Sequence, residues 1–161
     1  MQITPITPDD FALFWPTFKA VVESRETYAF DPEITFDDAY ALWCKLPQLT
    51  YVAKEDGVVL GSYYLKPNAA GPGDHVCNCG YMVAPEARGK GVARALCLHS
   101  QDQALEAGYQ AMQFNAVVAT NEAAIGLWQS LGFNIIGTVP GGYRHARHGL
   151  VDTHIMHKAL R

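Results

Sequence analysis

The sequence predicts an α/β or α+β domain built on a sheet, with antiparallel hairpins and at least one strand–helix–strand crossover. Three observations support this fold class. Apolar residues recur at helical spacing near the N-terminus, and two β-rich runs joined by a short turn follow later. A glycine-rich turn then leads from a β-rich run into a helical pattern, and another β-rich run follows that pattern. Glycines also stand where two of the expected helices end.

The first half of the chain predicts a short strand, two helices and a hairpin. The strand is expected at 2–6, the second helix at 36–46, and the hairpin strands at 50–54 and 58–65. Asp9 or Asp10 is expected to cap the first helix. Its apolar stripe consists of Phe11, Phe14, Phe18 and Val21. Pro16 lies inside this stripe and should kink or divide the helix.

The second half predicts alternating strands and helices. Strands are expected at 75–83, 110–118, 133–139 and 149–157, and a helix at 89–107. Gly108 stands where a glycine ends many helices. Asn121 can cap another helix, with Trp128 on its apolar face and Gly132 just past its end. Residues 143–148 are expected as a solvated polar loop, with contact to substrate as the alternative.

Length and composition favour one domain that spans residues 1–161. Folding at this length buries roughly two-thirds of the unfolded surface, and 49% hydrophobic with 17% charged residues is ordinary for a globular protein. Twelve basic against sixteen acidic residues give a net charge of −4, which argues against a general nucleic-acid binder. No signal peptide is read, and glycines and a proline interrupt the uncharged stretch 123–143. We therefore expect a cytoplasmic protein with no membrane partner.

The four cysteines are expected to be free thiols. They are Cys44, Cys77, Cys79 and Cys97. Without a secretory signal, such thiols are expected to stay reduced and at least half-buried. No CxxC or HExxH pattern is present, and His145 and His148 supply at most half of a metal site. We expect no bound metal.

The most informative segment is VAPEARGKGVARAL, residues 83–96. A strand that runs through a glycine-rich turn into a helix presents free backbone N–H groups and a helix dipole, which together favour phosphate oxygens. Gly89 and Gly91 allow close approach to the backbone. The turn is flanked by three basic side chains, Arg88, Lys90 and Arg94. Neither GxGxxG nor the GxxxxGK nucleotide motif is present, and a tight turn with solvated basic residues is the alternative.

This segment resembles the acetyl-CoA motif of the GNAT acetyltransferase superfamily, Q/R-x-x-G-x-G/A. Arg88, Gly91 and Ala93 fill its three defined positions. The stretch NEAAIGLWQSLGF at 121–133 resembles the family's next element, a helix that begins with Asn and ends in LGF. The resemblance extends from about residue 50 to the end of the chain.

The resemblance implies a GNAT fold and acetyl-CoA as cosubstrate. In that fold a mixed, mostly antiparallel central sheet is splayed between the strands near 75–83 and 110–118, with helices on both faces. The pantetheine would pair with backbone groups of 81–83, a backbone N–H near Val83 would polarise the thioester, and the pyrophosphate would bind at 88–94. The implied cofactor-binding residues are Tyr81, Met82, Val83, Arg88, Gly89, Lys90, Gly91, Val92, Ala93, Arg94, Asn121 and Trp128.

Two departures from the family pattern bear on the chemistry. Trp128 stands where many members carry a tyrosine that protonates the departing thiolate, and tryptophan is no such acid. A general acid contributes about 10²- to 10⁴-fold, but the CoA thiolate is already a fair leaving group. The central strand also lacks the glutamate that serves some members as base. A covalent route through Cys77 or Cys79 is chemically open, although the family transfers acetyl directly to the amine.

Within the superfamily, the chain most resembles the fungal N-acetyltransferases of azetidine-2-carboxylate, a proline analogue. The segments NCGYMV at 78–83 and FNAVV at 114–118, together with Asn121, carry this resemblance. They place two asparagines, Asn78 and Asn115, at the strand positions that hold the substrate in those enzymes.

The resemblance therefore implies Asn78 and Asn115 as catalytic and substrate-binding residues. Asn78 would orient the amine or a deprotonating water, while Asn115 and the backbone at Ala116 would receive the substrate carboxylate. Tyr81 would wall the pocket, and Tyr28, just after the first helix, would line it. The alternative is that both asparagines satisfy backbone groups at a strand edge and that Tyr28 packs on the core.

The implied function is direct transfer of acetyl, within a ternary complex, to the amine of a small carboxylate-bearing molecule such as an amino acid or its analogue. Other acceptors stay open: a protein N-terminus, a lysine or a polyamine. A non-catalytic module that senses acetyl-CoA is the alternative from another class. We expect no nucleic-acid partner, and because many family members dimerise, a homodimer is left open.

Overall fold

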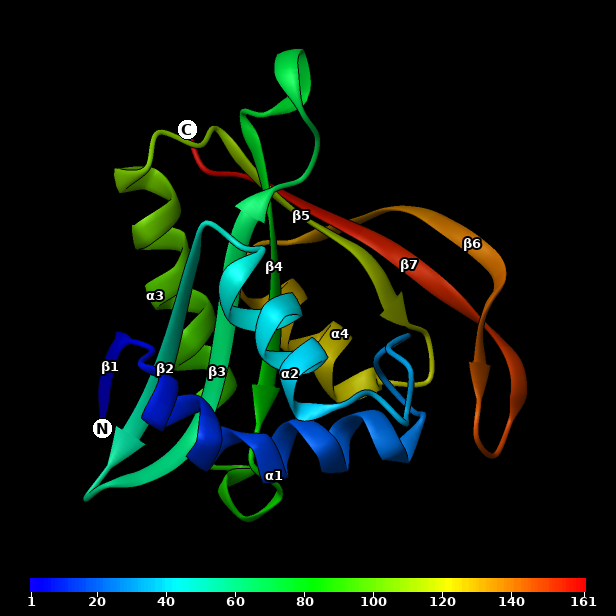
Figure 1. Ribbon diagram of the computed structural model, residues 1–161. Helices are drawn as coiled ribbons and strands as arrows, with labels where there is room; N and C mark the ends of the chain where they lie inside the picture. Colours follow the sequence, from blue (N-terminus) through cyan, green and yellow to red (C-terminus); the bar gives the residue numbers. More distant parts are fainter.

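The computed structural model describes residues 1–161 and contains one seven-stranded sheet with helices on both faces (Figure 1). The strands are β1 (Gln2–Pro5), β2 (Leu49–Glu55), β3 (Val58–Pro67), β4 (Val76–Val83), β5 (Ala111–Val118), β6 (Asn134–His145) and β7 (Gly149–Ala159). The helices are α1 (Pro8–Ser24), α2 (Phe36–Tyr40), α3 (Val92–Glu106) and α4 (Glu122–Ser130). A π-helical turn, Ala41–Lys45, continues α2, and short 3₁₀ turns lie at Gly71–Gly73 and Pro85–Ala87.

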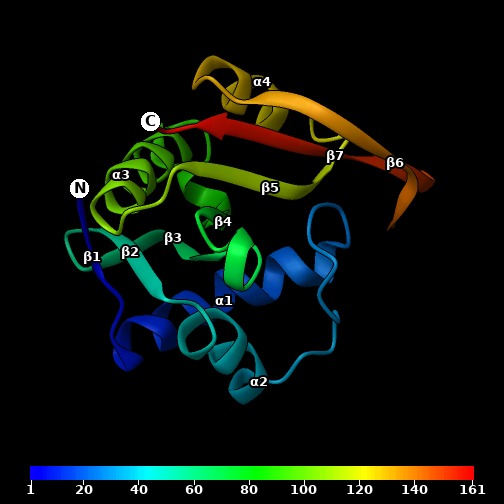
Figure 2. The same ribbon diagram turned by 90° about the horizontal axis from the view of Figure 1, so that it is seen from above.

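The strand order is β1-β2-β3-β4-β5-β7-β6, and only the β4–β5 pair is parallel. Helices α1 and α2 cover one face of the sheet, and α3 and α4 cover the other (Figure 2). This architecture confirms the expected mixed, mostly antiparallel sheet with helices on both faces. No helix of the chain combines the length and the apolar character that crossing a bilayer requires.

Helix α1 begins two or three residues earlier than expected. Thr7, not Asp9 or Asp10, is the N-cap: its hydroxyl accepts a hydrogen bond from the Asp10 N–H at 3.1 Å. The Asp10 carboxylate in turn accepts one from the Thr7 N–H at 3.0 Å. This reciprocal pair is a capping box, which satisfies two otherwise unpaired N–H groups.

Of the two effects expected of Pro16, a kink or a division, the division does not occur, because the helix runs without interruption from Pro8 to Ser24. Proline removes one hydrogen bond, the one that the carbonyl of Ala12 would accept. Both Pro16 and Ala12 are exposed, so water can satisfy that carbonyl. The opposite face of the helix stays buried in the aromatic core and holds it in place.

Three other boundaries differ from expectation. Helix α3 begins at Val92 and not at residue 89, because Gly89 and Gly91 have left-handed φ values of 76° and 78° that do not belong to a helix. Strand β7 ends two residues later than expected and β6 ends six residues later, so that β6 includes part of the segment expected as a polar loop. The hairpin of β2 and β3 was predicted correctly: Asp56 and Gly57, both with positive φ, form its turn.

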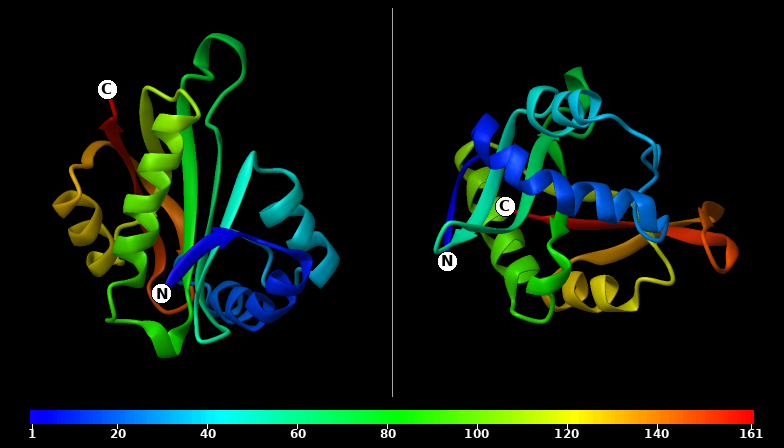
Figure 3. Two further views of the ribbon diagram at one scale, coloured as in Figure 1. Left: turned by 90° about the vertical axis from the view of Figure 1, so that its left-hand side faces the viewer. Right: turned by 60° about the horizontal axis from the view of Figure 1, so that its bottom comes forward.

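Two apolar clusters fill the spaces on either side of the sheet. Figure 3 shows from the side the two layers of helices that cover them. The cluster under α1 and α2 is aromatic, with Phe11, Phe14, Phe18 and Trp43 fully buried. The Trp43 indole N–H is satisfied by the Ser62 hydroxyl at 2.9 Å. The larger cluster under α3 and α4 includes three of the four cysteines, and all four are free thiols. The expectation of buried or half-buried thiols is therefore confirmed.

The sheet opens between β4 and β5. These parallel strands pair only at Val76 with Ala111 and at Cys77 with Met112, and then diverge (Figure 1). On its other side β5 follows β7, with a bulge between Phe114 and Val117 that bends it away from β4. The gap therefore lies between the two strands for which the family resemblance implied a splay.

The capping box of α1 predicts a pH-dependent contribution to stability. Burial alone would raise the pKa of the Asp10 carboxyl, but hydrogen bonds from Lys54 (2.9 Å) and Thr7 outweigh it and lower this pKa. A carboxyl with a lowered folded-state pKa stabilises the fold above its unfolded pKa, and this contribution disappears as pH falls through the folded pKa. Asp10→Asn should therefore cost about 1–2 kcal/mol in unfolding free energy near neutral pH.

Urea unfolding of wild type and Asp10→Asn near neutral pH and again at about pH 3, below the usual carboxyl pKa, measures this effect. The difference between the two proteins should shrink at the acidic pH. Asp9→Asn is the control, because Asp9 is an exposed carboxylate in the same helical turn. An equal loss in the control would show that the helix dipole, and not the capping box with Lys54, accounts for the effect.

Candidate functional site

The free edge of β4 presents peptide groups to the gap. The even-numbered residues of β4 direct their peptide groups toward β3. The Val76 carbonyl accepts from the Asn68 N–H, and the Ala84 N–H donates to the Leu60 carbonyl, both at 2.8 Å. Backbone groups alternate along a strand. The groups that face the gap beyond the last β4–β5 pair are therefore those of Cys79, Tyr81 and Val83.

The turn that follows β4 exposes a continuous run of donors. Arg88 N–H donates to the Pro85 carbonyl, and Ala95 N–H makes the first backbone bond of α3, to the Gly91 carbonyl. Between them, the six backbone N–H groups from Gly89 to Arg94 have no hydrogen-bond partner within the protein. A Cβ built on Gly89 or Gly91 would meet open space. This arrangement fits the phosphate oxygens of a nucleotide cofactor, which accept hydrogen bonds at helix N-termini.

The basic residues of the turn are available to an anion. Arg88 and Lys90 are exposed, and the ion pairs of the chain involve other residues. The Arg94 guanidinium reaches the Ser130 hydroxyl at 3.4 Å and so links the start of α3 to the end of α4. Val92 is buried under the turn and Ala93 is half-buried. The turn thus combines positive charge with unpaired backbone donors.

Helix α4 borders the same region. The Asn121 side chain caps this helix by accepting from the Ala124 N–H at 3.3 Å, as expected, which leaves its amide nitrogen for another partner. Trp128 is buried and packs on the rings of Tyr81 and Phe114, with centroids 5.1 and 5.2 Å away. The prediction for Trp128 is packing against either the cofactor or the core, and the structure places it in the core.

Tyr81 does not share a face with Asn78. Its ring belongs to the cluster under α3 and α4, and its hydroxyl lies 2.6 Å from the Ser100 hydroxyl. The next residue, Met82, points to the opposite face, into the cluster under α1 and α2. Because side chains alternate along β4, the Tyr81 side chain cannot wall a pocket around Asn78, and that expectation was wrong. Only its peptide group belongs to the gap.

Asn78 bridges β4 and β5 at the point where they separate. Its side-chain amide donates to the Gln113 carbonyl at 3.0 Å, and its oxygen accepts from the Tyr64 hydroxyl at 3.2 Å. The last backbone pair of the two strands is one residue earlier, so this side chain continues the pairing after the backbone has ceased to do so. Burial raises the pKa of Tyr64 to about 12, which keeps its phenol a neutral donor.

Asn115 lies on the same face of the sheet but is exposed. It accepts from the Gln113 side chain at 3.0 Å and donates to the Asn68 side chain at 2.8 Å. Asn115 and Ala116 occupy the bulge of β5, where neither is in register with a β7 residue. The two asparagines are thus joined through Gln113 and do not bond to each other.

Tyr28 connects the loop after α1 to the gap. Its hydroxyl accepts from the Tyr81 N–H and donates to the Tyr81 carbonyl, both at 2.7 Å. Its ring stacks on Phe30, with centroids 5.2 Å apart, and meets Trp43 edge-on. Burial raises the pKa of the Tyr28 phenol well above its usual value, so it stays neutral. Tyr28 therefore both lines the site and packs on the core.

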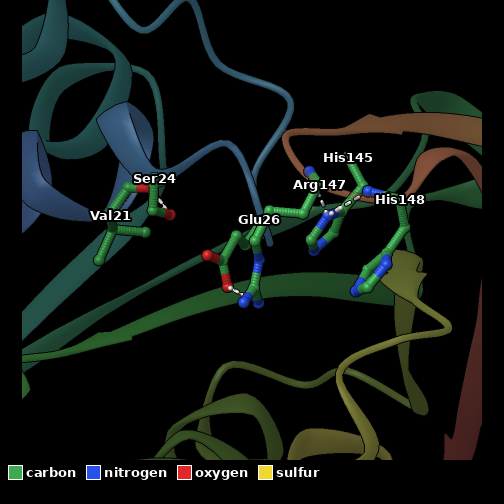
Figure 4. A network of polar contacts seen from close by, with 6 residues as sticks. All are labelled: Val21, Ser24, Glu26, His145, Arg147 and His148. Atoms are coloured by element: carbon green, nitrogen blue, oxygen red, sulfur yellow. Dashed lines mark hydrogen bonds and ion pairs between the residues drawn. The ribbon is translucent and has the colours of Figure 1, made fainter.

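The tip of the β6–β7 hairpin closes onto this loop (Figure 4). The Ala146 N–H donates to the Arg25 carbonyl at 3.0 Å, and the Arg147 guanidinium lies 3.4 Å from the Glu26 carboxylate. The Nδ1 atom of His145 accepts two backbone N–H bonds, from Arg147 at 3.1 Å and His148 at 3.3 Å. The neutral ring therefore carries its proton on Nε2.

The expectation of a solvated loop at 143–148 was wrong for 143–145, which belong to β6, whereas 146–148 form an exposed turn. Tyr143 and His145 belong to β6 and are 7% and 5% exposed, and the Tyr143 hydroxyl donates to the Tyr28 carbonyl at 3.0 Å. The sequence pattern did not show this part of the site, because it predicted a strand that ends at residue 139 and a polar loop at 143–148. The alternation of Tyr143 and His145, two residues apart, was the signal that could have shown a strand.

Between the loop and the hairpin lies an open pocket of about 550 Å³. Its lining includes Tyr28, Tyr143 and His145, together with two arginines, Arg25 and Arg144, and contains no Asp or Glu. Neither arginine takes part in an ion pair. Because Tyr28 also contacts the Tyr81 peptide, this pocket and the β4–β5 gap adjoin.

Nucleophile and metal chemistry find little support in this arrangement. Burial raises the pKa of the Cys79 thiol well above its usual value, and a protonated thiol is a poor nucleophile. No group of three or more His, Cys, Asp and Glu side chains is placed to hold a metal ion. Cys79 is therefore a packing residue of the larger cluster.

Comparison with known proteins agrees with this geometry. The model of the acetyltransferase (GNAT) family matches residues 11–133. The N-acetyltransferase aca1 of Schizosaccharomyces pombe is 31% identical over 151 residues, which cover 83% of this chain and 72% of that protein. The structure of a GCN5-related N-acetyltransferase from Kribbella flavida superposes with a TM-score of 0.94 at 48% identity, covering 98% of this chain and 96% of that one.

A further structure shares the fold at lower identity. The putative acetyltransferase yncA from Salmonella typhimurium, solved with its cofactor acetyl-CoA, superposes with a TM-score of 0.87. It is 24% identical, and the match covers 100% of this chain and 94% of that one. The fold described above is thus one in which acetyl-CoA has been observed.

The glycine turn yields a direct test of cofactor binding. Gly91→Val would force a β-branched side chain onto a left-handed φ of 78° and place it where the structure leaves open space. We expect the Kd for acetyl-CoA, measured by calorimetry, to rise by at least about tenfold, which corresponds to about 1.4 kcal/mol.

Gly57→Val is the matched control, because Gly57 has a φ of 76° and open space around its Cβ but lies in the β2–β3 turn. It should strain the backbone equally and leave the Kd for acetyl-CoA unchanged. Unaltered affinity in Gly91→Val would contradict the assignment of the turn as the phosphate site.

Proposed function

Because the chain belongs to the acetyltransferase (GNAT) family and is an acetyl-CoA-dependent N-acetyltransferase, we propose that its acceptor is the amine of a small molecule that also bears a carboxylate. One observation carries the proposal: the pocket beside the gap has two unpaired arginines and no acidic residue in its lining. A cationic polyamine or a basic peptide would meet repulsion there, whereas a carboxylate would be attracted.

The gap and the glycine turn are assigned to the cosubstrate. Acetyl-CoA supplies the acetyl group as a thioester. The N–H groups from Gly89 to Arg94 bind its pyrophosphate, helped by Arg88 and Lys90. Peptide groups of β4 pair with the pantetheine arm, and one of their N–H groups polarises the thioester carbonyl and stabilises the developing oxyanion.

The amine is proposed to attack the thioester directly. The buried, protonated Cys79 supports a route without an acetyl-enzyme intermediate. The side chain of Asn78, held between Tyr64 and Gln113, is well fixed and lies at the closed end of the gap. In this proposal it orients the amine, or the water that removes the amine's proton and passes it to bulk solvent.

The substrate carboxylate has two candidate partners. One is Asn115 with the backbone of Ala116 in the β5 bulge, where exposed groups without β7 partners can donate hydrogen bonds. The other is the pair of arginines in the pocket, Arg25 and Arg144, which bind carboxylates well through paired donors. The free thiols of all four cysteines favour the cytoplasm, a reducing compartment, as the place of the reaction.

Release of free thiol from acetyl-CoA, measured with a panel of amines, tests the acceptor class. The panel contains amino acids, proline analogues, polyamines and a lysine peptide, and each carboxylate-bearing amine is paired with its amide or ester. We expect turnover with a carboxylate-bearing amine and a loss of at least about tenfold in kcat/KM when its charge is blocked. Faster turnover of a polyamine or the lysine peptide would refute the proposed acceptor class.

The asparagines are tested separately. Asn115→Ala should raise the KM for the amine by about tenfold with kcat nearly unchanged. Asn78→Ala should lower kcat as well, because it also removes the side-chain link between β4 and β5 at the point where they separate. Both variants should retain the Kd for acetyl-CoA. Asn134→Ala, at the exposed start of β6, is the control that should match wild type. Normal kinetics in both site variants would remove the asparagines from the mechanism.

A further inference from the structure

Only one of the three gap-facing peptides of β4 is engaged by a side chain. The Tyr28 hydroxyl holds both the N–H and the carbonyl of Tyr81, at 2.7 Å each, whereas the peptides of Cys79 and Val83 have no side-chain partner. This hydroxyl makes the two hydrogen bonds, one to the N–H and one to the carbonyl of the same residue, that a neighbouring strand or an extended ligand with amide groups would otherwise make. Tyr28 thus occupies the middle of the free edge.

Tyr28 is also tied to the acceptor side of the site. Its carbonyl accepts from the Tyr143 hydroxyl at 3.0 Å, and three residues earlier the Arg25 carbonyl accepts from the Ala146 N–H. The same residue lines the pocket between the loop and the hairpin. A displacement of the Tyr28 side chain would therefore change the wall of that pocket.

We propose that Tyr28 is a positioning residue that occupies the Tyr81 peptide in the free enzyme and is displaced from it when acetyl-CoA binds. The Tyr81 N–H can donate one strong hydrogen bond, so the phenol and a cofactor amide or carbonyl compete for it. Displacement of the phenol moves the shared wall and so couples occupation of the gap to the shape of the acceptor pocket. By linkage, the amine and acetyl-CoA then affect each other's affinity equally.

If the Tyr28 hydroxyl competes with the cofactor, a substitution that removes this hydroxyl should improve cofactor binding. Tyr28→Phe keeps the ring on Phe30 and Trp43 but removes the competing hydroxyl. We expect the Kd for acetyl-CoA, measured by calorimetry without any amine, to fall by about three- to tenfold. The rise in Tm on adding acetyl-CoA should be larger than in wild type. A purely structural role of the hydroxyl would not tighten binding.

Tyr109→Phe is the matched control, since it also removes a phenol hydroxyl that makes a hydrogen bond, here to Gln48. Tyr109 lies just before the start of β5, at the end where β4 and β5 are paired, so this variant should leave the Kd for acetyl-CoA unchanged. An unchanged or weaker Kd in Tyr28→Phe would overturn the proposal. Because binding is measured without acceptor, this outcome is independent of whether the thiol-release panel identifies a carboxylate-bearing substrate.

A measurement on the wild-type protein covers the case in which Tyr28→Phe does not fold. In the free protein, a nuclear Overhauser effect should connect the Tyr28 ring to the Tyr81 amide proton, because the phenol oxygen lies 2.7 Å from the Tyr81 nitrogen. Saturation with acetyl-CoA should abolish it. Persistence of this contact in the saturated protein would show that the two occupants do not compete.

Discussion

The early separation of β4 from β5 is the constraint on which the site depends. Two residue pairs join these strands, and every peptide group beyond them on the facing edges must find another partner or remain open to solvent. Asn78 takes the first position after the pairing ends and Tyr28 takes one further along. The bulge in β5 keeps the strands apart, while β7 supports β5 from its other side. The gap is therefore a stable feature of the sheet.

The sequence predicted the glycine-rich turn after β4 and the start of α4 well, because both depend on local signals. The run from Arg88 to Arg94 specifies its own conformation through two glycines, and Asn121 caps a helix within its own segment. The same local reasoning placed the β2–β3 hairpin. It failed at the start of α1, because the N-cap is Thr7 and not Asp9 or Asp10. Asp10 is instead the partner of Thr7 in the capping box.

The surroundings of Tyr28 could not be predicted in this way, because their contacts join distant segments. Tyr28 and Tyr81 are 53 residues apart in the chain, and Tyr143 and Tyr28 are 115 apart. No local pattern identifies the residue that a phenol will bond to across such a distance. Tyr81 shows the reverse difficulty: the sequence placed it correctly on β4 but assigned a role to its ring that alternation along the strand does not allow.

The two proposed binding sites are built from different parts of the chain, and this difference has an evolutionary consequence. The donors that we propose for the pyrophosphate are main-chain N–H groups, which survive almost any substitution that preserves the turn. The pocket that we propose for the acceptor is instead built from residues of two surface segments, 25–32 and 142–146. Mutation can therefore change the choice of amine without disturbing the shared acyl donor. A lineage with this architecture can acquire new substrates by mutation of those two segments, while the binding of the acyl donor is inherited unchanged.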